Sequence, residues 1–310
     1  DVEGLTSVST SGSVDVTGAA YDFAVASHGT SVAFGNVRPN ATRNLSVTNV
    51  LLGADATYQD ALRVAATRSN GRLTLANPGA DIVAGQSANV VVTAATAGFL
   101  TDTINLALTS KAAAAGLGDA NLAAGTATVT GAVYDYAVAA VAATRALGNV
   151  RVGATANLSV GNTTVTSADF QDRLAVAATS SATGRLTVAD PATAIAAGTT
   201  GNVVLTAAAP GVLNGTDVSL VLTSQALAGT GLSDLTLAPA TVAITGTAYD
   251  LARATHATTA AFANVRVGAQ RTLAVSNTLR TAGAAAYQDD LAVTASSGSA
   301  KVTVAGAADI

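Results

Sequence analysis

The stretch FGNVRPNATRNLSVTN, residues 34–49, returns twice along the chain, as LGNVRVGATANLSVGN at 147–162 and as FANVRVGAQRTLAVSN at 262–277. The starts of the three copies set a period of about 114 residues, the size of one small domain. A Gln-Asp pair keeps the same register, since YQD at 58–60 is followed one period later by FQD at 170–172. Self-similarity of this extent indicates one structural unit that the chain uses repeatedly.

Within each period, apolar residues alternate with polar ones. Leu45 and Val47 alternate with polar neighbours in RNLSVTN, and Leu73 and Leu75 do so in RLTLA. Short alternating runs rich in Val, Thr and Leu, separated by Gly, Asn, Asp and Pro, are typical of half-buried strands. About seven such runs fall in each period, which is the strand number of an immunoglobulin-like sandwich. The predicted fold class is therefore all-β, with tandem immunoglobulin-like β-sandwich repeats of about 114 residues.

The alignment of the periods predicts where each repeat begins and ends. The first 18 residues align with the end of the next period, and the last residues, KVTVAGAADI, align with RLTVADPATAI in the middle of the preceding one. The Ala-rich segment 110–125 has some helical character, but its counterpart contains two Gly and a Pro, so both are expected to be a loop between the last two strands. The expected domains are 1–18, the closing strand of a preceding or partner repeat; 19–131, the first sandwich; 132–246, the second sandwich; and 247–310, the first half of a third.

The composition argues against several classes of function. Of 310 residues, 49% are hydrophobic and 11% are charged, the formal net charge is −4, and Lys occurs only at positions 111 and 301. Such a chain has no basic patch to neutralise phosphates, so nucleic acid is not an expected partner. Its apolar stretches are too short to span a bilayer, so we expect no membrane insertion by this segment. The lack of Cys excludes disulfides, zinc–thiolate sites and cysteine nucleophiles.

The histidines and the repeated carboxylates are candidates for chemistry. His28 and His256 follow their repeat tyrosines at the same distance, without a second His or a carboxylate cluster, so we expect exposed residues near a domain junction. Aspartates recur after the tyrosine and after the glutamine, and paired carboxylates can hold calcium or do acid–base work. Their presence in every period favours hydrogen bonding at a turn, with calcium at the junctions as the alternative. These positions are Tyr21, Asp22, Tyr134, Asp135, Tyr249 and Asp250, and Asp60, Asp172 and Asp289.

An Asn-Val-Arg triplet is a more specific repeated motif. The interpretation that we favour is a turn in which Asn caps the backbone and Arg pairs with a neighbouring Asp. No Gly-rich phosphate loop and no Ser-His-Asp constellation is found in the sequence. We therefore expect no catalytic residue, no cofactor site and no metal site, and a structural role at repeat junctions for the repeated residues. The polar members of the triplets are Asn36, Arg38, Asn149, Arg151, Asn264 and Arg266.

The order of these motifs resembles a known family. FGNVR, NLSVTN, a later GL and TVTGAVYDYA succeed one another as in the choice-of-anchor D type repeats of proteobacterial surface proteins. That family is similar in turn to the Hydin-like, immunoglobulin-type sandwiches, and the match covers essentially the whole chain. The resemblance implies a long extracellular or cell-surface protein and brings no enzymatic residues with it. The chain departs from the family pattern at YQD and FQD, where a more variable segment is expected.

Three classes of function remain at the sequence level. The first is structural: TVTG runs straight into VYDYA without a spacer, which suits an extracellular filament, sheath or adhesin stalk on a bacterial surface, with copies of the chain as partners. Head-to-tail strand complementation between copies and a slice of a longer array both explain the leading strand and the half repeat. The second class is a glycan- or receptor-binding adhesin module, although 6 Tyr, 5 Phe and no Trp offer few aromatic platforms. An enzyme is the least favoured class.

Overall fold

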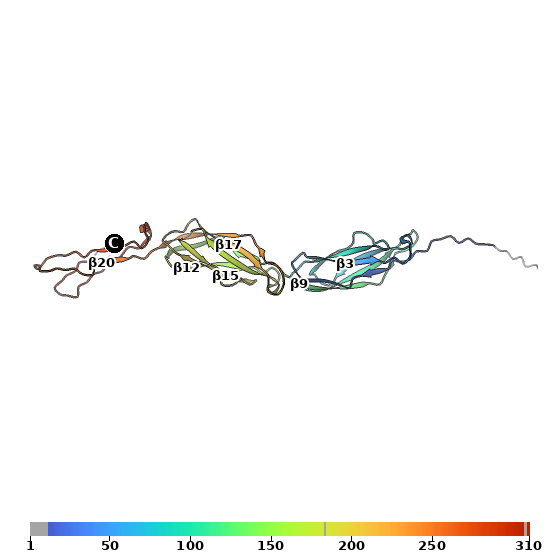
Figure 1. The fold of residues 1–310 in the computed structure, drawn as a ribbon, viewed down its shortest axis with the longest axis horizontal. Helices are drawn as coiled ribbons and strands as arrows, with labels where there is room; N and C mark the ends of the chain where they lie inside the picture. The colour runs from blue at the N-terminus through green and yellow to red at the C-terminus, as the bar shows by residue number, and fades with distance from the viewer. Residues whose placement is uncertain (1–11, 183, 307–308) are drawn as a thin grey trace, which may run out of the picture. The chain divides into compact units, whose positions relative to one another are not determined.

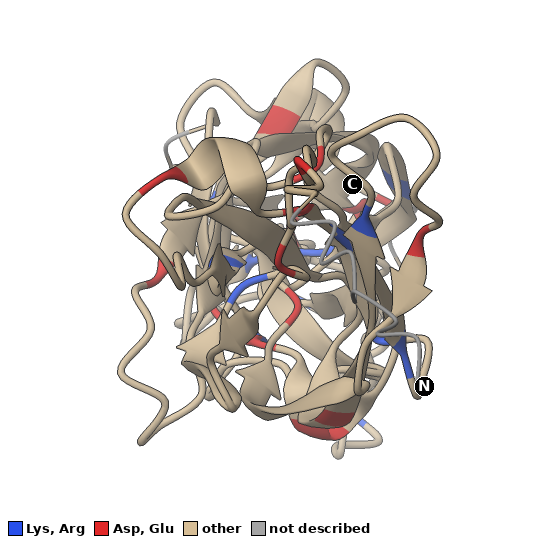
Figure 2. Cartoon of the chain, turned by 90° about the vertical axis from the view of Figure 1, so that its right-hand side faces the viewer, with Lys and Arg blue, Asp and Glu red and all other residues tan. Residues whose placement is uncertain are grey.

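The computed structural model describes residues 12–182, 184–306 and 309–310. These residues form strands and loops with three single-turn 3-10 helices, so the predicted all-β fold is confirmed. The chain forms two compact units, Asp1–Val133 and Tyr134–Ile310 (Figure 1). Among the described residues, no helix is long and apolar enough to cross a membrane. Charged residues are sparse along the ribbon (Figure 2).

The first unit contains two sheets that pack face to face. One sheet has the strand order β1-β3-β6-β5 and the other β2-β9-β7-β4, with the short β8 paired to β7. This is the division of an immunoglobulin constant-type sandwich, A-B-E-D against C-F-G, with β2 added beside the last strand. The elements are β1 (Ala26–His28), β2 (Ser31–Val37), β3 (Thr42–Asn49), η1 (Ala56–Tyr58), β4 (Ala61–Arg68), β5 (Leu73–Ala76), β6 (Ser87–Ala94), β7 (Gly98–Lys111), β8 (Ala120–Asn121) and β9 (Gly125–Val133).

The core of the first sandwich consists of the inward residues of the alternating strands. Leu45 and Val47 of β3 are 1% and 0% exposed, and they share one hydrophobic cluster with Leu106 of β7 in the opposite sheet. Phe34 is the one aromatic residue of this cluster, and the others are Val, Leu, Ile and Ala. Each buried Leu or Val contributes roughly 1.5–3 kcal/mol relative to an exposed one. Period-two alternation therefore accounts for this core, as the sequence predicts.

The first and last long strands of the sandwich pair in parallel. β2 runs alongside β9 from the pair Ser31 and Thr128 to the pair Val37 and Val133, with an irregularity near Gly35. Here Gly131 has a φ of +146°, and a Cβ atom at this position would lie 2.6 Å from the Gly35 carbonyl oxygen. Only glycine fits such a conformation at so close an approach of two backbones.

The second unit begins with a sandwich of the same design. Its sheets have the orders β10-β12-β15-β14 and β11-β19-β17-β13, and the two short strands β16 and β18 pair with β19 and β17. In Figure 1, β12 and β15 lie side by side, as their register requires. The elements are β10 (Ala139–Val141), β11 (Thr144–Arg151), β12 (Thr155–Asn162), η2 (Ala168–Phe170), β13 (Arg173–Ser180), β14 (Leu186–Ala189), β15 (Thr199–Ala207), β16 (Gly211–Val212), β17 (Thr216–Gln225), β18 (Leu235–Thr236) and β19 (Ala240–Tyr249).

The remainder of the second unit is a third segment, residues 250–310, with β20 (Ala254–His256), β21 (Val275–Asn277) and η3 (Ala285–Tyr287). β20 pairs with β21 as β1 does with β3, since Ala254 faces Asn277 and Ala26 faces Asn49. Leu273, the equivalent of the buried Leu45, is 47% exposed.

The expected domain boundaries at 18, 131 and 246 stay predictions. Residues 12–20 form no strand, and residues 1–11 of the predicted closing strand lie outside the described residues. In the Ala-rich segment 110–125, the structure has the ends of β7 and β9, the short β8 and turns, but no helix.

Candidate functional site

A buried asparagine at the end of β3 organises one end of the first sandwich. Asn49 is 0% exposed. Its Nδ2 donates to the carbonyl oxygens of Asp60 at 2.9 Å and Ile82 at 3.0 Å. Its Oδ1 accepts from the backbone N–H of Val25 at 3.1 Å and from Nε2 of Gln59 at 3.3 Å. Both amide hydrogens and the amide oxygen are therefore engaged, and the side chain ties β3 to three other segments.

Gln59 and Asp60 extend this arrangement. Gln59 donates from Nε2 to the Val50 carbonyl at 2.8 Å and accepts the Leu52 N–H at 2.9 Å, so it holds the chain that leaves β3. The Asp60 carboxylate accepts from the Ser110 hydroxyl of β7 at 2.8 Å. We call Asn49, Gln59, Asp60 and Ser110, with their equivalents in the other repeats, the polar network.

The loop after β7 closes over the polar network. The Ala113 N–H donates to the Asp60 carboxylate at 3.0 Å, and the neighbouring Ala112 N–H donates to Asp119 Oδ1 at 3.1 Å. A hydrogen bond from Lys111 Nζ, and then that of Ala112, hold the pKa of Asp119 below its usual value. Asp119 therefore remains a charged acceptor at neutral pH and keeps the loop anchored.

The polar network recurs in the second sandwich and partly in the third segment. Asn162 donates to the carbonyl oxygens of Asp172 and Ile195 at 2.9 and 3.1 Å, and the Ser224 hydroxyl donates to Asp172 Oδ2 at 2.7 Å. In the third segment, Asn277 donates to the Asp289 carbonyl at 2.8 Å and accepts from Gln288 Nε2 at 2.7 Å. The bonds of the asparagine with the Gln-Asp pair are thus a property of the repeat, since all three copies of the sequence motif make them.

The predicted tyrosine and aspartate positions lie beside the polar network. Each repeat tyrosine packs its ring against the aromatic residue before the Gln-Asp pair, with ring centroids 5.7, 5.5 and 6.2 Å apart. Each following aspartate forms a parallel bridge with the repeat glutamine. Asp22 is exposed, whereas Asp135 and Asp250 are 8% and 7% exposed. The ring pairs are Tyr21 with Tyr58, Tyr134 with Phe170 and Tyr249 with Tyr287.

The Asn-Val-Arg triplets lead into the expected turn, but the asparagine lies before it: in all three repeats the arginine carbonyl accepts the N–H of the alanine three residues later, at 3.2, 3.0 and 3.1 Å. Asn36 and Asn149 lie exposed within β2 and β11, because these strands continue through the motif to pair with β9 and β19. Arg151 is the last residue of β11 and Arg38 follows β2, while Asn264 and Arg266 lie exposed outside the strands of the third segment. Their common role at repeat junctions stays a prediction.

One joint between repeats lies within the second unit and is built from these residues. β19 of the second sandwich ends at Tyr249, and the next residue, Asp250, already belongs to the third segment: its N–H donates to the Tyr287 carbonyl at 2.8 Å. Arg151, which faces Tyr249 in the β11–β19 pair, forms an ion pair with Asp289. The joint therefore has no spacer, and one ring pair and one ion pair connect its two sides.

The histidines show no partner set for chemistry. His28 Nδ1 lies 2.8 Å from the carbonyl oxygen of Gly29, and His256 Nδ1 lies 3.0 Å from that of Ala257. Within the described residues, no group of three or more His, Cys, Asp or Glu side chains is placed to hold a metal ion.

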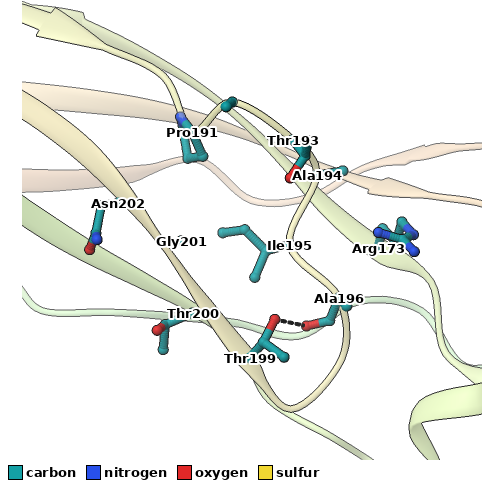
Figure 3. Close-up of a pocket in the computed structure, with 11 residues that line it drawn as sticks. Arg173, Pro191, Thr193, Ala194, Ile195, Ala196, Thr199, Thr200, Gly201 and Asn202 are labelled. Atoms are coloured by element: carbon teal, nitrogen blue, oxygen red, sulfur yellow. Dashed lines mark hydrogen bonds between the residues drawn. The ribbon is translucent and has the colours of Figure 1, made fainter.

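Each sandwich carries a surface hollow at the same place, in front of the loop that precedes β6 or β15. In the second sandwich the hollow measures about 420 Å³ and lies between Arg173, the loop 191–196 and the start of β15 (Figure 3). In the first it measures about 360 Å³ and is lined by residues 78–83 and 86–89. The exposed lining is mainly polar in the second sandwich and mainly apolar in the first.

Sequence reasoning missed the amide and hydroxyl members of the polar network. The signal was present, because Leu45, Val47 and Asn49 lie two residues apart and therefore face the same side of the strand. A polar residue at an inward position, repeated in three periods, indicates a buried hydrogen-bonded site. The missed residues are Asn49, Asn162, Asn277, Gln59, Gln171, Gln288, Ser110 and Ser224.

No protein-family model matches the chain, and no curated protein matches it. Solved structures with a similar arrangement include a protein of unknown function from Porphyromonas gingivalis W83, with 13% identity over 72% of this chain and 99% of that one and a TM-score of 0.26. Human protocadherin-24 EC1-2 has 11% identity over 72% and 98% and a TM-score of 0.34. The D00-D0 domain of intimin has 12% identity over 70% and 99% and a TM-score of 0.30. At such identities and TM-scores, the likeness carries no conclusion about function.

Proposed function

We propose that the chain is a structural repeat protein that forms an extracellular filament, sheath or adhesin stalk on a bacterial surface. The observation that carries this proposal is the joint after Tyr249, where the last strand of one sandwich passes into the next repeat without a spacer. A continuous chain with a ring pair and an ion pair across the joint restricts bending between neighbouring repeats, which is what an extended repeat array needs to stay straight.

We further propose that the repeats belong with the choice-of-anchor D type and Hydin-like sandwiches. Support comes from the order of the motifs along the chain and from the strand order of each sandwich. An extracellular location on a bacterial surface is part of the same proposal. The described residues offer no metal-binding cluster that would favour another class of function.

Copies of the chain are the partners that we propose for assembly, through head-to-tail strand complementation. Val14 and Val16 are 85% and 92% exposed, whereas their equivalents in β19, Val242 and Ile244, are fully buried. In both sandwiches that strand pairs in parallel with β2 or β11. The corresponding segment of the third repeat, residues 259–266, forms no strand. A second copy's residues 13–18 would pair with it in the register of β2 and β9.

Light scattering and negative-stain microscopy test the assembly. The full chain is compared with a chain that lacks residues 1–18 and with Val16→Asp, which keeps the length but places a charge on the inward face of the strand. Filaments from the full chain and monomers from both variants are the expected result. If all three chains had the same oligomeric state, strand complementation would be refuted.

A second candidate function, a glycan- or receptor-binding adhesin module, is favoured by one specific observation. The hollow of the second sandwich has a polar lining that includes Arg173. The two functions are compatible, since a stalk can carry a binding site on one of its repeats.

A further inference from the structure

The hollow of the second sandwich differs from its counterpart in charge. In the first sandwich, Arg63 Nε and Nη2 donate to the two carboxylate oxygens of Asp81 at 2.8 and 3.0 Å. The two side chains therefore form a bidentate ion pair, in which the charge of the carboxylate balances that of the guanidinium. This pair joins directly opposed positions, because the bridge between Leu62 and Ile82 places residue 63 opposite residue 81.

In the second sandwich the arginine has moved and its acidic partner is missing. Arg173 precedes the equivalent bridge between Leu174 and Ile195, so it lies opposite Ala196. The hollow is lined by no acidic residue, and within the described part of the chain no carboxylate forms an ion pair with Arg173. The nearby Asp190 lies outside the lining and accepts the Ala178 N–H at 2.6 Å. Arg173 is therefore exposed at the edge of a concave surface, and the carboxylate nearest to it in the β13–β17 pairing, Asp234, accepts the Ala226 N–H at 2.8 Å.

The rest of the lining adds hydroxyl and amide groups. Figure 3 shows Ile195 among the lining residues, directed toward Gly201, with Arg173 at one side and Asn202 at the other; Ile195 itself is 3% exposed and belongs to the core. A Cβ atom at Gly201 would lie 2.8 Å from Ile195 Cγ1, so the glycine lets the two segments approach closely. Around them, Thr193, Thr199, Thr200 and Asn202 supply side-chain donors and acceptors. The Thr199 hydroxyl donates to the Ala196 carbonyl at 2.8 Å and keeps its lone pairs as acceptors.

We propose that this hollow binds a carboxylate-bearing saccharide. A guanidinium forms parallel hydrogen bonds with a planar carboxylate, which is the strongest recognition that the lining offers. Threonine hydroxyls and an asparagine amide suit sugar hydroxyls, which both donate and accept. The lining contains no aromatic side chain, so a neutral sugar would lack a stacking platform and the charged group must provide the selectivity. This inference deepens the second candidate function and is independent of filament assembly.

Binding is measured on the full chain by NMR titration with a trisaccharide of galacturonic acid and with the neutral galactose trisaccharide. We expect millimolar binding of the acidic probe, shifts of the amide signals of residues 192–202, and weaker binding at high salt because the site is exposed. Arg173→Gln should weaken binding by about tenfold or more. Ala196→Asp should do the same, because it places a carboxylate opposite Arg173 as Asp81 lies opposite Arg63.

Arg63→Gln in the first sandwich is the matched control and should leave the affinity unchanged. Equal binding of the neutral probe, shifts confined to other parts of the chain, or no binding of the acidic probe would each overturn the proposal. An unchanged affinity in Arg173→Gln would also overturn it. None of these outcomes bears on the filament experiment, so failure of the site and failure of the structural function are distinguishable.

Discussion

At the scale of the residue, Asn49 and its two equivalents have an unusual position. Asn49 and Asn162 are buried at the end of a strand whose other inward residues are Leu and Val, yet they are polar, and Asn277 has the same place in the sequence of the third repeat. A buried amide is tolerated only when its hydrogen bonds are made, and here the partners are backbone groups of segments far apart in the sequence. The amide thus fixes the path of the chain at one end of a core that has few large side chains.

Replacing Asn49 with Ala leaves the Val25 N–H and the carbonyl groups of Asp60 and Ile82 without this partner. We expect the first sandwich to lose about 2–4 kcal/mol of stability, because several buried polar groups lose hydrogen bonds at once. Native-state hydrogen exchange of β3 and β6 would measure the loss, with β12 and β15 as an internal reference. Asn105→Ala, on the exposed face of β7, is the control and should change little. Similar losses in both variants would contradict the role of the buried amide.

At the scale of the element, period-two alternation was sufficient to predict the strands and their inward faces. It could not predict the partners, because alternation assigns a residue to a face and says nothing about which strand lies beside it. The parallel pairing of β2 with β9 was therefore not foreseen, and in the Asn-Val-Arg motif the asparagine lies within this pair although the arginine begins the expected turn. The aspartates of the Gln-Asp motif were expected to form hydrogen bonds, but the partners of Asp60 come from β7 and the loop after it, which no spacing rule connects.

Gly246→Ala tests the parallel pair of the second sandwich. Gly246 has a φ of +146°, and a Cβ atom there would lie 2.5 Å from the Gly148 carbonyl oxygen, so β11 and β19 would have to separate. We expect a loss of about 2–4 kcal/mol, measured by hydrogen exchange of residues 144–151 and 240–249. Gly118→Ala, where a Cβ atom meets nothing within 4 Å, should change stability by less than about 0.5 kcal/mol. Unaltered exchange in Gly246→Ala would show that the strands can shift to admit a methyl group.

At the scale of the whole molecule, the feature to test is the joint after Tyr249, where side-chain contacts hold the third segment against the second sandwich. Tyr249→Ala removes the ring contact with Tyr287, and we expect faster hydrogen exchange in residues 285–289 while β12 stays protected. Arg151→Gln should have a much smaller effect, because the pair with Asp289 is exposed and such pairs contribute about 0–1 kcal/mol. The opposite order of effects would mean that charge, and not ring packing, holds the joint.

The parallel pairing of β2 with β9 determines how a sandwich responds to tension. When a repeat is pulled through its neighbours, force enters through the segment before β2 and leaves through the end of β9. Because the two strands run in the same direction, this tension slides them past each other along their length. The hydrogen bonds between them lie across the line of force, so the whole ladder from Ser31 to Val37 is loaded together and cannot open one bond at a time. We therefore expect each sandwich to resist tension along the chain, which is the load that the proposed stalk would carry in a moving fluid.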